Sequence, residues 1–204
     1  QRQMCIRDRA NTGGNINVQS DYKIVQTYGS TINTSGHTSG GDVFLSAPNI
    51  MSSGNISSKG NQQGGYIDIE SEGYIRLLSS NINVAGNTQG GLVRIGGEFQ
   101  GKNNLTRTPE QQEVFVDRWD ARPSLKNAKT VLVSDGSSID ISSSNGKAGT
   151  AIIWSDHETT MIGNINARGT IGGAVEISSK DTLRHVGLSN VNISEGGHLL
   201  LDPK

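Results

Sequence analysis

Large apolar side chains are scarce in this chain of 204 residues. Hydrophobic residues make up 32% of it and aromatic residues 4%, whereas a compact globular domain carries close to half apolar residues. A conventional core of leucine and phenylalanine is therefore not expected. The longest apolar run, Ala151–Trp154, has four residues, which is far too short to cross a bilayer as a helix.

An excess of charge of one sign is also missing. Lys and Arg number 18 against 19 Asp and Glu, so no nucleic-acid partner is expected. The single Cys5 excludes an intrachain disulfide. The four histidines stand without metal-ligand spacing, and the glycines precede strands rather than helices, which argues against a phosphate loop. We expect no cofactor and no metal site.

Glycine, by contrast, is abundant, with 27 residues, and much of it falls in a repeated motif. A Gly-Gly corner followed by alternating apolar residues begins at Gly40, Gly64, Gly90, Gly172 and Gly196. Within each of the two groups that these corners form, neighbouring corners lie about 24–26 residues apart. Repeats of this length, each with two or three short strands, are typical of a solenoid.

A second alternating run precedes each corner and supplies one apolar residue at a similar offset. Period-two alternation indicates a strand with one buried face. These apolar residues should stack inward as one column: Ile32, Ile56, Ile82, Ile139, Ile165 and Val191. The predicted fold class is all-β, a parallel β-helix (solenoid) with about 24 residues per coil. Residues 10–204 are expected to form its single domain.

The residue before that column is often asparagine: Asn55, Asn81, Asn164 and Asn190. Two interpretations are open. The asparagines form amide ladders that hold the coils in register, or they only fit the conformation of the corner. We favour the second, because all four sit in the turn before the apolar residue.

One interval breaks the repeat. The step from Gly91 to Gly149 is longer than two periods of the repeat by about ten residues, so we place an excursion at about 101–129. Within it, Thr108-Pro109-Glu110-Gln111 resembles a capping box with proline in the first helical turn. A short helix is therefore predicted near Pro109–Trp119.

The excursion also gathers charged and aromatic residues, and it holds the candidate partner-binding residues Arg118, Trp119 and Arg122. Segments free of the stacking constraint can present a shaped site. We expect Trp119 to be exposed and Trp154, at the end of an apolar strand, to be buried. Two arrangements remain open. The excursion projects from the solenoid, or it folds back and covers a coil, with the Val114-Phe115-Val116 segment as the shield.

Residues 1–9 differ from the rest of the chain, because they contain three arginines and no glycine. They resemble a translated sequencing adapter. We leave them out of the fold as an artefact or a disordered arm that packs against nothing.

Five segments resemble, in order, those of a known family: Val93–Gly101, Ala148–Asp156, Gly163–Gly169, Gly172–Lys180 and Leu199–Pro203. The family is that of filamentous-haemagglutinin-like exoproteins of the two-partner secretion pathway, in their shaft repeat region. The resemblance covers about residues 90–204, and residues 13–90 agree in repeat style only. It implies a right-handed β-helix of the pectin-lyase-like kind, export through an outer-membrane transporter barrel, and a secreted, cell-surface location.

On this resemblance we expect a fragment of the shaft of an adhesin, with a receptor or glycan on a host or neighbouring cell as partner. Its open strand edges predict end-to-end self-association. Two alternatives stay open: the shaft of a contact-dependent inhibition toxin carrier, and a carbohydrate-active enzyme on the same fold. Catalysis would need clustered carboxylates. The candidates Asp117, Asp120 and Asp156, with His157, show no such cluster in the sequence, so no enzyme is expected.

Overall fold

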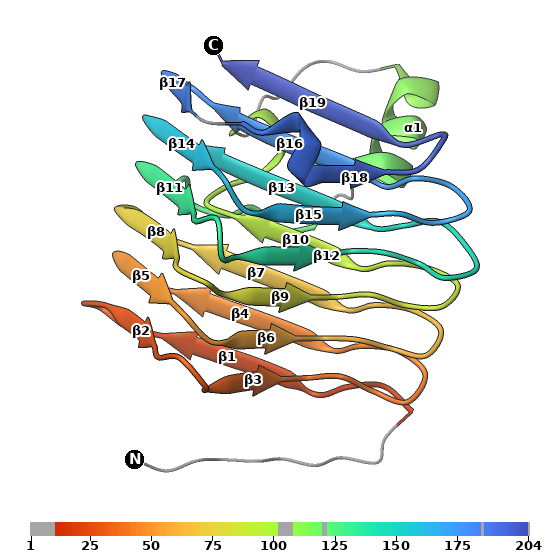
Figure 1. Cartoon of the computed structure of the whole chain (residues 1–204), viewed down its shortest axis with the longest axis horizontal. Coiled ribbons are helices and arrows are strands. Elements are labelled where there is room, and N and C mark those ends of the chain that lie inside the picture. The colour runs from red at the N-terminus through yellow and green to blue at the C-terminus, as the bar shows by residue number, and fades with distance from the viewer. Residues whose placement is uncertain (1–10, 102–107, 120–121, 185, 204) are drawn as a thin grey trace.

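The computed structural model describes residues 11–101, 108–119, 122–184 and 186–203. Within these ranges the chain winds through three parallel sheets, as Figure 1 shows. The first sheet contains β1 (Asn15–Gln19), β4 (Asp42–Ser46), β7 (Tyr66–Glu70), β10 (Leu92–Ile95), β13 (Thr150–Ser155), β16 (Ala174–Ser179) and β19 (His198–Pro203). The expectation for residues 1–9 lies outside the described residues.

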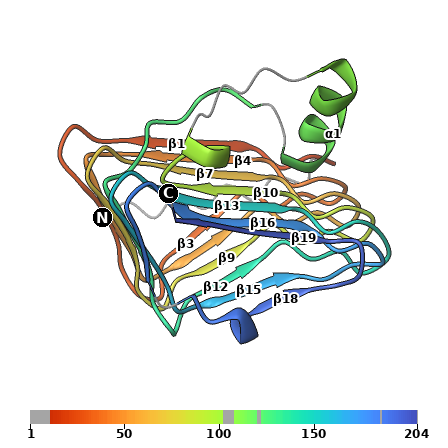
Figure 2. The same ribbon diagram turned by 90° about the horizontal axis from the view of Figure 1, so that it is seen from above.

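The other two sheets have one strand per coil up to the sixth coil. The second sheet contains β2 (Ile24–Gln26), β5 (Asn49–Ser52), β8 (Tyr74–Leu77), β11 (Thr130–Val133), β14 (Glu158–Met161) and β17 (Thr182–Arg184). The third contains β3 (Thr31–Asn33), β6 (Asn55–Ser57), β9 (Asn81–Asn83), β12 (Ser138–Asp140), β15 (Asn164–Ala167) and β18 (Val191–Ile193). The all-β parallel solenoid is confirmed, and Figure 2 shows its coils nested one above another.

The register gives the length of each coil. Along the first sheet, the paired residues are Asn15, Asp42, Tyr66, Leu92, Thr150, Ala174 and His198. Most coils therefore have about 24–27 residues, an ordinary repeat length for a solenoid. Leu92 pairs directly with Thr150. The long interval from Gly91 to Gly149 is thus one coil with a large insertion, and its division into two periods and a remainder is wrong.

The interior is a narrow stack of aliphatic side chains, one column for each inward position. The column predicted from the sequence is confirmed, because its members pair in register along the third sheet: Ile32, Ile56, Ile82, Ile139, Ile165 and Val191. Ile56 and Ile139 are 0% exposed, whereas Ile32 and Val191, in the outer coils, are only partly buried. Each coil contributes few inward side chains, which explains how 32% hydrophobic residues suffice.

Close packing of the coils explains the Gly-Gly corners. The second glycine of a corner closes a turn within its own coil, as in the bond from Gly65 N to Ser58 O at 2.7 Å. A Cβ added to the first glycine, Gly64, would overlap the carbonyl oxygen of Val84 in the next coil. Only glycine allows the backbones to approach this closely.

The asparagines before the inward column do more than fit the corner. Asn81 Nδ2 donates to Asn55 Oδ1 at 3.1 Å, and Ser138 Oγ donates to Asn81 Oδ1 at 2.8 Å. These bonds join three successive coils. The bond between Asn55 and Asn81 is the amide pair that the ladder predicts, so our preference for the other interpretation is wrong at these two positions. Asn190 instead donates its amide to the carbonyl of Ile162 at 2.6 Å.

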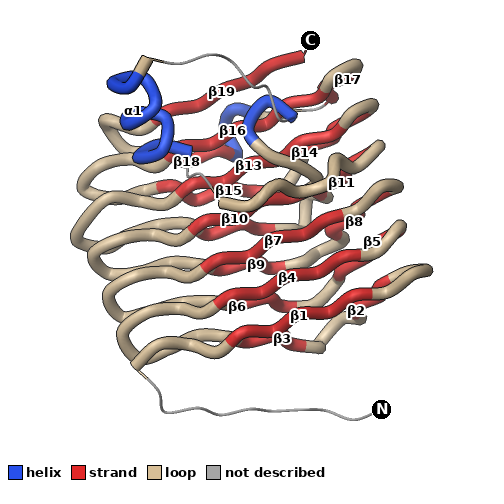
Figure 3. The backbone as a smooth tube through the Cα atoms, turned by 180° about the vertical axis from the view of Figure 1, so that it is seen from behind, coloured by secondary structure: helices blue, strands red, loops and turns tan. Residues whose placement is uncertain are grey.

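The excursion joins β10 to β11 and contains the 3₁₀ turn η1 (Phe99–Gly101) and the helix α1 (Pro109–Trp119). The predicted helix and its capping box are confirmed. Gln111 N donates to Thr108 Oγ1 at 3.3 Å, and Thr108 N donates to Gln111 Oε1 at 3.0 Å. Figures 2 and 3 show α1 outside the first sheet, beside its later strands. In the described part of the chain, no helix has the length and hydropathy needed to cross a membrane.

Candidate functional site

The excursion folds back onto the outer face of the first sheet, where three carboxylates hold its backbone. Glu176, on β16, is 0% exposed and accepts a bond from Gln100 N at 2.9 Å. Glu70, on β7, accepts one from Lys126 N at 3.0 Å. Glu98 accepts one from Leu125 N at 2.9 Å. Hydrogen bonds to charged acceptors are among the stronger ones, so the excursion is fixed at both its beginning and its end.

A buried ion pair adds a fourth attachment. Arg94, on β10, is 4% exposed, and its Nε and Nη2 donate to the two carboxylate oxygens of Asp68 at 2.8 and 2.7 Å. Its Nη1 donates to the carbonyl of Pro123 at 3.0 Å. Asp68 and Arg94 face each other on the outside of adjacent coils, and the excursion shields both from water.

Trp119 is buried, not exposed, and the expectation of an exposed aromatic is wrong. Its side chain is 7% exposed and lies 4.4 Å from the ring of Phe99, measured between centroids. It forms a second, small core with Ile152 and Ala174 on the outside of the sheet, with Phe115 packed against it. The expected burial of Trp154 is confirmed at 2% exposure, with its Nε1 donating to Asp156 Oδ1 at 3.2 Å.

The two candidate arginines contact different coils. The guanidinium of Arg122 lies 3.9 Å from the ring centroid of Tyr66 and pairs with Asp42 Oδ1 at 3.5 Å. Arg118 is half-buried, and its carbonyl accepts a bond from Thr150 Oγ1 at 2.8 Å. The structure therefore does not bring Arg118, Trp119 and Arg122 together as one exposed patch.

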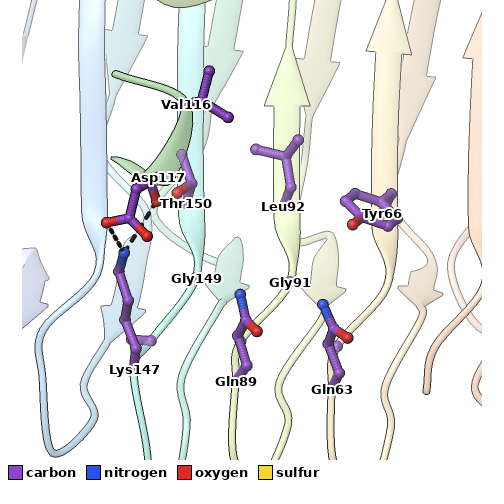
Figure 4. A pocket seen from close by; sticks show the side chains of 13 residues that line it. Gln63, Tyr66, Gln89, Gly91, Leu92, Val116, Asp117, Lys147, Gly149 and Thr150 are labelled. Carbon is purple, nitrogen blue, oxygen red and sulfur yellow. Dashed lines mark hydrogen bonds and ion pairs between the residues drawn. The ribbon is translucent and has the colours of Figure 1, made fainter. Parts of the chain in front are cut away.

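Two positively charged side chains, Arg118 and Lys147, lie near the carboxyl end of α1 and close to His198. Partial desolvation lowers the pKa of His198, an exposed residue on β19, and the positive charges of Arg118 and Lys147 lower the pKa further. Lys147 Nζ pairs with Asp117 Oδ2 at 2.7 Å. This pair closes one end of a hollow of about 190 Å³ under α1, which we call the α1 hollow. Figure 4 shows Gln63, Gln89 and Lys147 side by side at its edge.

A larger hollow of about 390 Å³ lies where the return segment of the excursion meets the first coils. We call it the Arg122 groove. Its lining residues are Asn15, Ile16, Asn17, Asp42, Val43, Phe44, Tyr66, Asp68, Arg94, Arg122, Pro123, Ser124 and Leu125. Tyr66 also lines the α1 hollow, so this residue stands at the junction of the two hollows.

Asp117 and Asp156, which were considered for catalysis, each have a structural partner. Asp117 pairs with Lys147, and Asp156 accepts bonds from Trp154 and from Asn127 Nδ2 at 3.0 Å. His157 Nδ1 lies 2.9 Å from Asp181 Oδ2 at an exposed position. Asp120 lies outside the described residues. Over the ranges that the structure describes, no three His, Cys, Asp or Glu side chains gather to hold a metal ion.

The sequence carries one signal of this covered face. In Ala151–Trp154 the alternation is lost, because apolar residues occupy both the inward and the outward positions of β13. A strand that is apolar on both faces is covered on both faces. The carboxylate attachments at Glu70, Glu98 and Glu176 had no comparable signal, since their partners are backbone amides of the excursion.

The described part of the chain has three parallel sheets, seven strands in the first of them and one lateral excursion, which together define a β-solenoid. No family model and no curated protein sequence matches the chain. Its fold is similar to the crystal structure of the HMW1 secretion domain from Haemophilus influenzae, with a TM-score of 0.63 and 25% sequence identity. The similarity covers 94% of this chain and 46% of that one, so the chain spans about half the length of that structure.

Proposed function

We propose that this chain is a β-solenoid segment of a large secreted bacterial exoprotein that uses the two-partner pathway and acts in adhesion at the cell surface. The observation that carries the proposal is the similarity to a secretion domain, at 25% identity over 94% of the chain. The five family-like segments of the sequence support the same pathway. The partner for export is then a transporter barrel in the outer membrane, and the partner for adhesion is a receptor or glycan on another cell.

The physical character of the fold suits export of an unfolded chain. Apart from the excursion, the described strands of each coil pair only with strands of the neighbouring coils, as in the successive pairing of β4 with β7 and of β7 with β10. A solenoid of this kind gains stability coil by coil, so it can form as the chain emerges from a pore. The sequence holds one cysteine, so no intrachain disulfide has to form after export.

Two positions within such an exoprotein fit the chain. The filamentous-haemagglutinin-like shaft fits the repeat motifs of residues 90–204. A part of the secretion domain itself fits the structural similarity. The shaft of a contact-dependent toxin carrier has the same solenoid and remains an alternative to the adhesin shaft.

A non-enzymatic role is part of the proposal. The structural use of Asp117 and Asp156, each already bonded to a neighbour, supports it against a carbohydrate-active enzyme.

The strands β1 and β19 are the outer edges of the first sheet. In the isolated chain these edges favour end-to-end association.

Export can be tested in a Gram-negative host that carries a two-partner transporter. The chain is produced behind a periplasmic signal peptide in two forms, alone and fused after the transporter's own secretion domain. Surface protease sensitivity is measured with and without the transporter. Transporter-dependent exposure of the chain alone supports the secretion-domain position, and exposure of the fusion only supports the shaft. If both forms stay in the periplasm, the proposal is wrong.

A further inference from the structure

The Arg122 groove contains aromatic rings and planar polar groups. The return segment of the excursion forms one of its sides. Phe44 on β4 and Tyr66 on β7 are half-buried on the outer face of adjacent coils. The guanidinium of Arg122 lies over Tyr66 at 3.9 Å from the ring centroid. The exposed amides of Asn15 and Asn17, on β1, border the other side of the groove.

The charges within the groove balance one another. Asp68 is paired with Arg94 at 2.7 Å, and Asp42 is paired with Arg122 at 3.5 Å. A ligand with a net charge of either sign would have to compete with one of these pairs. The groove therefore favours an uncharged ligand that carries hydrogen-bonding groups and an apolar face.

A peptide strand does not fit this floor. A peptide that extends a sheet needs a free strand edge to hydrogen-bond. The floor strands β4 and β7 are each paired on both sides, β4 with β1 and β7, and β7 with β4 and β10. β1 also borders the groove, but its unpaired edge is on the side away from β4, so over β4 and β7 only side chains are available to a ligand. Nucleic acid would need unpaired positive charge, which the balanced groove lacks.

We propose that the Arg122 groove binds a neutral saccharide chain that runs along the solenoid axis over β1, β4 and β7. The apolar C–H faces of sugar rings stack on the electron-rich ring of Phe44 and on the flat guanidinium of Arg122, which the Tyr66 ring holds in place at 3.9 Å. Sugar hydroxyls bond to Asn15, Asn17 and Asp42, since amides and carboxylates form hydrogen bonds with hydroxyls of an uncharged ligand. Successive coils are about 4.8 Å apart, which is close to the length of one pyranose unit. This inference names a ligand for the adhesive role proposed above and rests on it.

The test measures saccharide affinity in matched tyrosine variants. Tyr74 is the control for Tyr66. Both begin a strand, and the guanidinium of Arg76 lies 4.6 Å from the Tyr74 ring centroid, but Tyr74 belongs to the second sheet and lies outside the groove. The probes are neutral hexose and N-acetylhexosamine oligosaccharides, with sialylated and sulfated oligosaccharides as charged comparators. Binding is followed by calorimetry and by amide chemical shifts.

A neutral oligosaccharide should shift the amide signals of Asn15, Asn17 and Asp42. Tyr66→Ala should weaken its binding by about ten-fold or more, and Tyr74→Ala should leave it unchanged. Asn17→Ala, at an exposed position, provides a second variant if Tyr66→Ala does not fold, and it should also weaken binding.

Three results would overturn the inference: no binding of any neutral oligosaccharide, binding of charged ones only, or equal losses in the two tyrosine variants. If adhesion requires Tyr66 and persists after glycans are removed from the target cells, the ligand is a protein and the inference is wrong. A chain that is exported and adheres without binding saccharide refutes this inference alone. A chain that the transporter does not export refutes the proposed function, whatever it binds.

Discussion

Replacing Arg94 by alanine should destabilise the solenoid far more than replacing an exposed arginine. The substitution leaves the Asp68 carboxylate, 7% exposed, without its bidentate partner and leaves the Pro123 carbonyl without the Arg94 donor. Removing one partner of a buried pair costs about 3–5 kcal/mol. With an m value of about 2 kcal/mol/M in urea, the midpoint should fall by about 1.5–2.5 M.

Arg184 on β17 is the matched control. Its Nε donates to Glu158 Oε2 at 2.7 Å, so it also bonds an acidic side chain of the preceding coil. The side chains of this pair are 57% and 35% exposed, and an exposed pair contributes about 0–1 kcal/mol. Arg184→Ala should therefore shift the urea midpoint by less than about 0.5 M.

The comparison is made by urea denaturation followed by far-ultraviolet circular dichroism. Replacing both members of the buried pair, Arg94→Met with Asp68→Leu, should recover much of the loss, because no charge is then left buried. Equal midpoints for Arg94→Ala and Arg184→Ala would refute the reasoning. They would mean that the excursion does not shield Asp68 and Arg94 from water.

Three further predictions concern other parts of the structure. Trp119→Ala should lower the free energy of unfolding by about 3–5 kcal/mol. Val114 is 53% exposed on the same helix, so Val114→Ala should lower it by less than about 0.5 kcal/mol. Equal urea midpoints would contradict the burial of Trp119. Gly64→Ala should destabilise the chain, because the added Cβ would overlap Val84 O. Gly14→Ala is the control, because no atom lies within 4 Å of its added Cβ. The melting temperature should fall in the first variant and stay unchanged in the second. The lowered pKa of His198 means that the folded state binds a proton less readily than the unfolded state, so the stability present above the ordinary histidine pKa is lost as pH falls below it. His198→Gln should reduce that loss, and an unchanged pH dependence of melting would contradict the assignment.

The repeat was readable from the sequence because each coil obeys the same local rules. The inward column from Ile32 to Val191 and the corners at Gly40, Gly64 and Gly90 follow from alternation and from close approach of backbones. The helix Pro109–Trp119 was predictable for the same reason, since its cap at Thr108 and Gln111 is local. Such features depend on residues near one another in the chain.

The placement of the excursion could not be predicted, because its contacts join distant parts of the chain. Gln100 bonds to Glu176, and Lys126 bonds to Glu70, each across more than one coil of sequence. The charged and aromatic residues of the excursion are compatible with a projecting site and with a cover of the sheet. Burial of Trp119 against Ile152 and Ala174 decides for the cover. The predicted shield is only partly right, because Phe115 packs there whereas Val114 and Val116 are 53% and 41% exposed. The Arg122 groove exists only because the excursion folds back.

The central claim is that the segment between Leu92 and Thr150 makes one coil, with the excursion held against the outside of the first sheet. The most direct measurement is of nuclear Overhauser contacts between backbone protons of β10 and β13. Neighbouring parallel strands lie about 4.8 Å apart, so contacts between Leu92 and Thr150 and between Arg94 and Ile152 are expected. Contacts from Leu92 to a strand within 101–129, in place of Thr150, would show an additional coil and contradict the account.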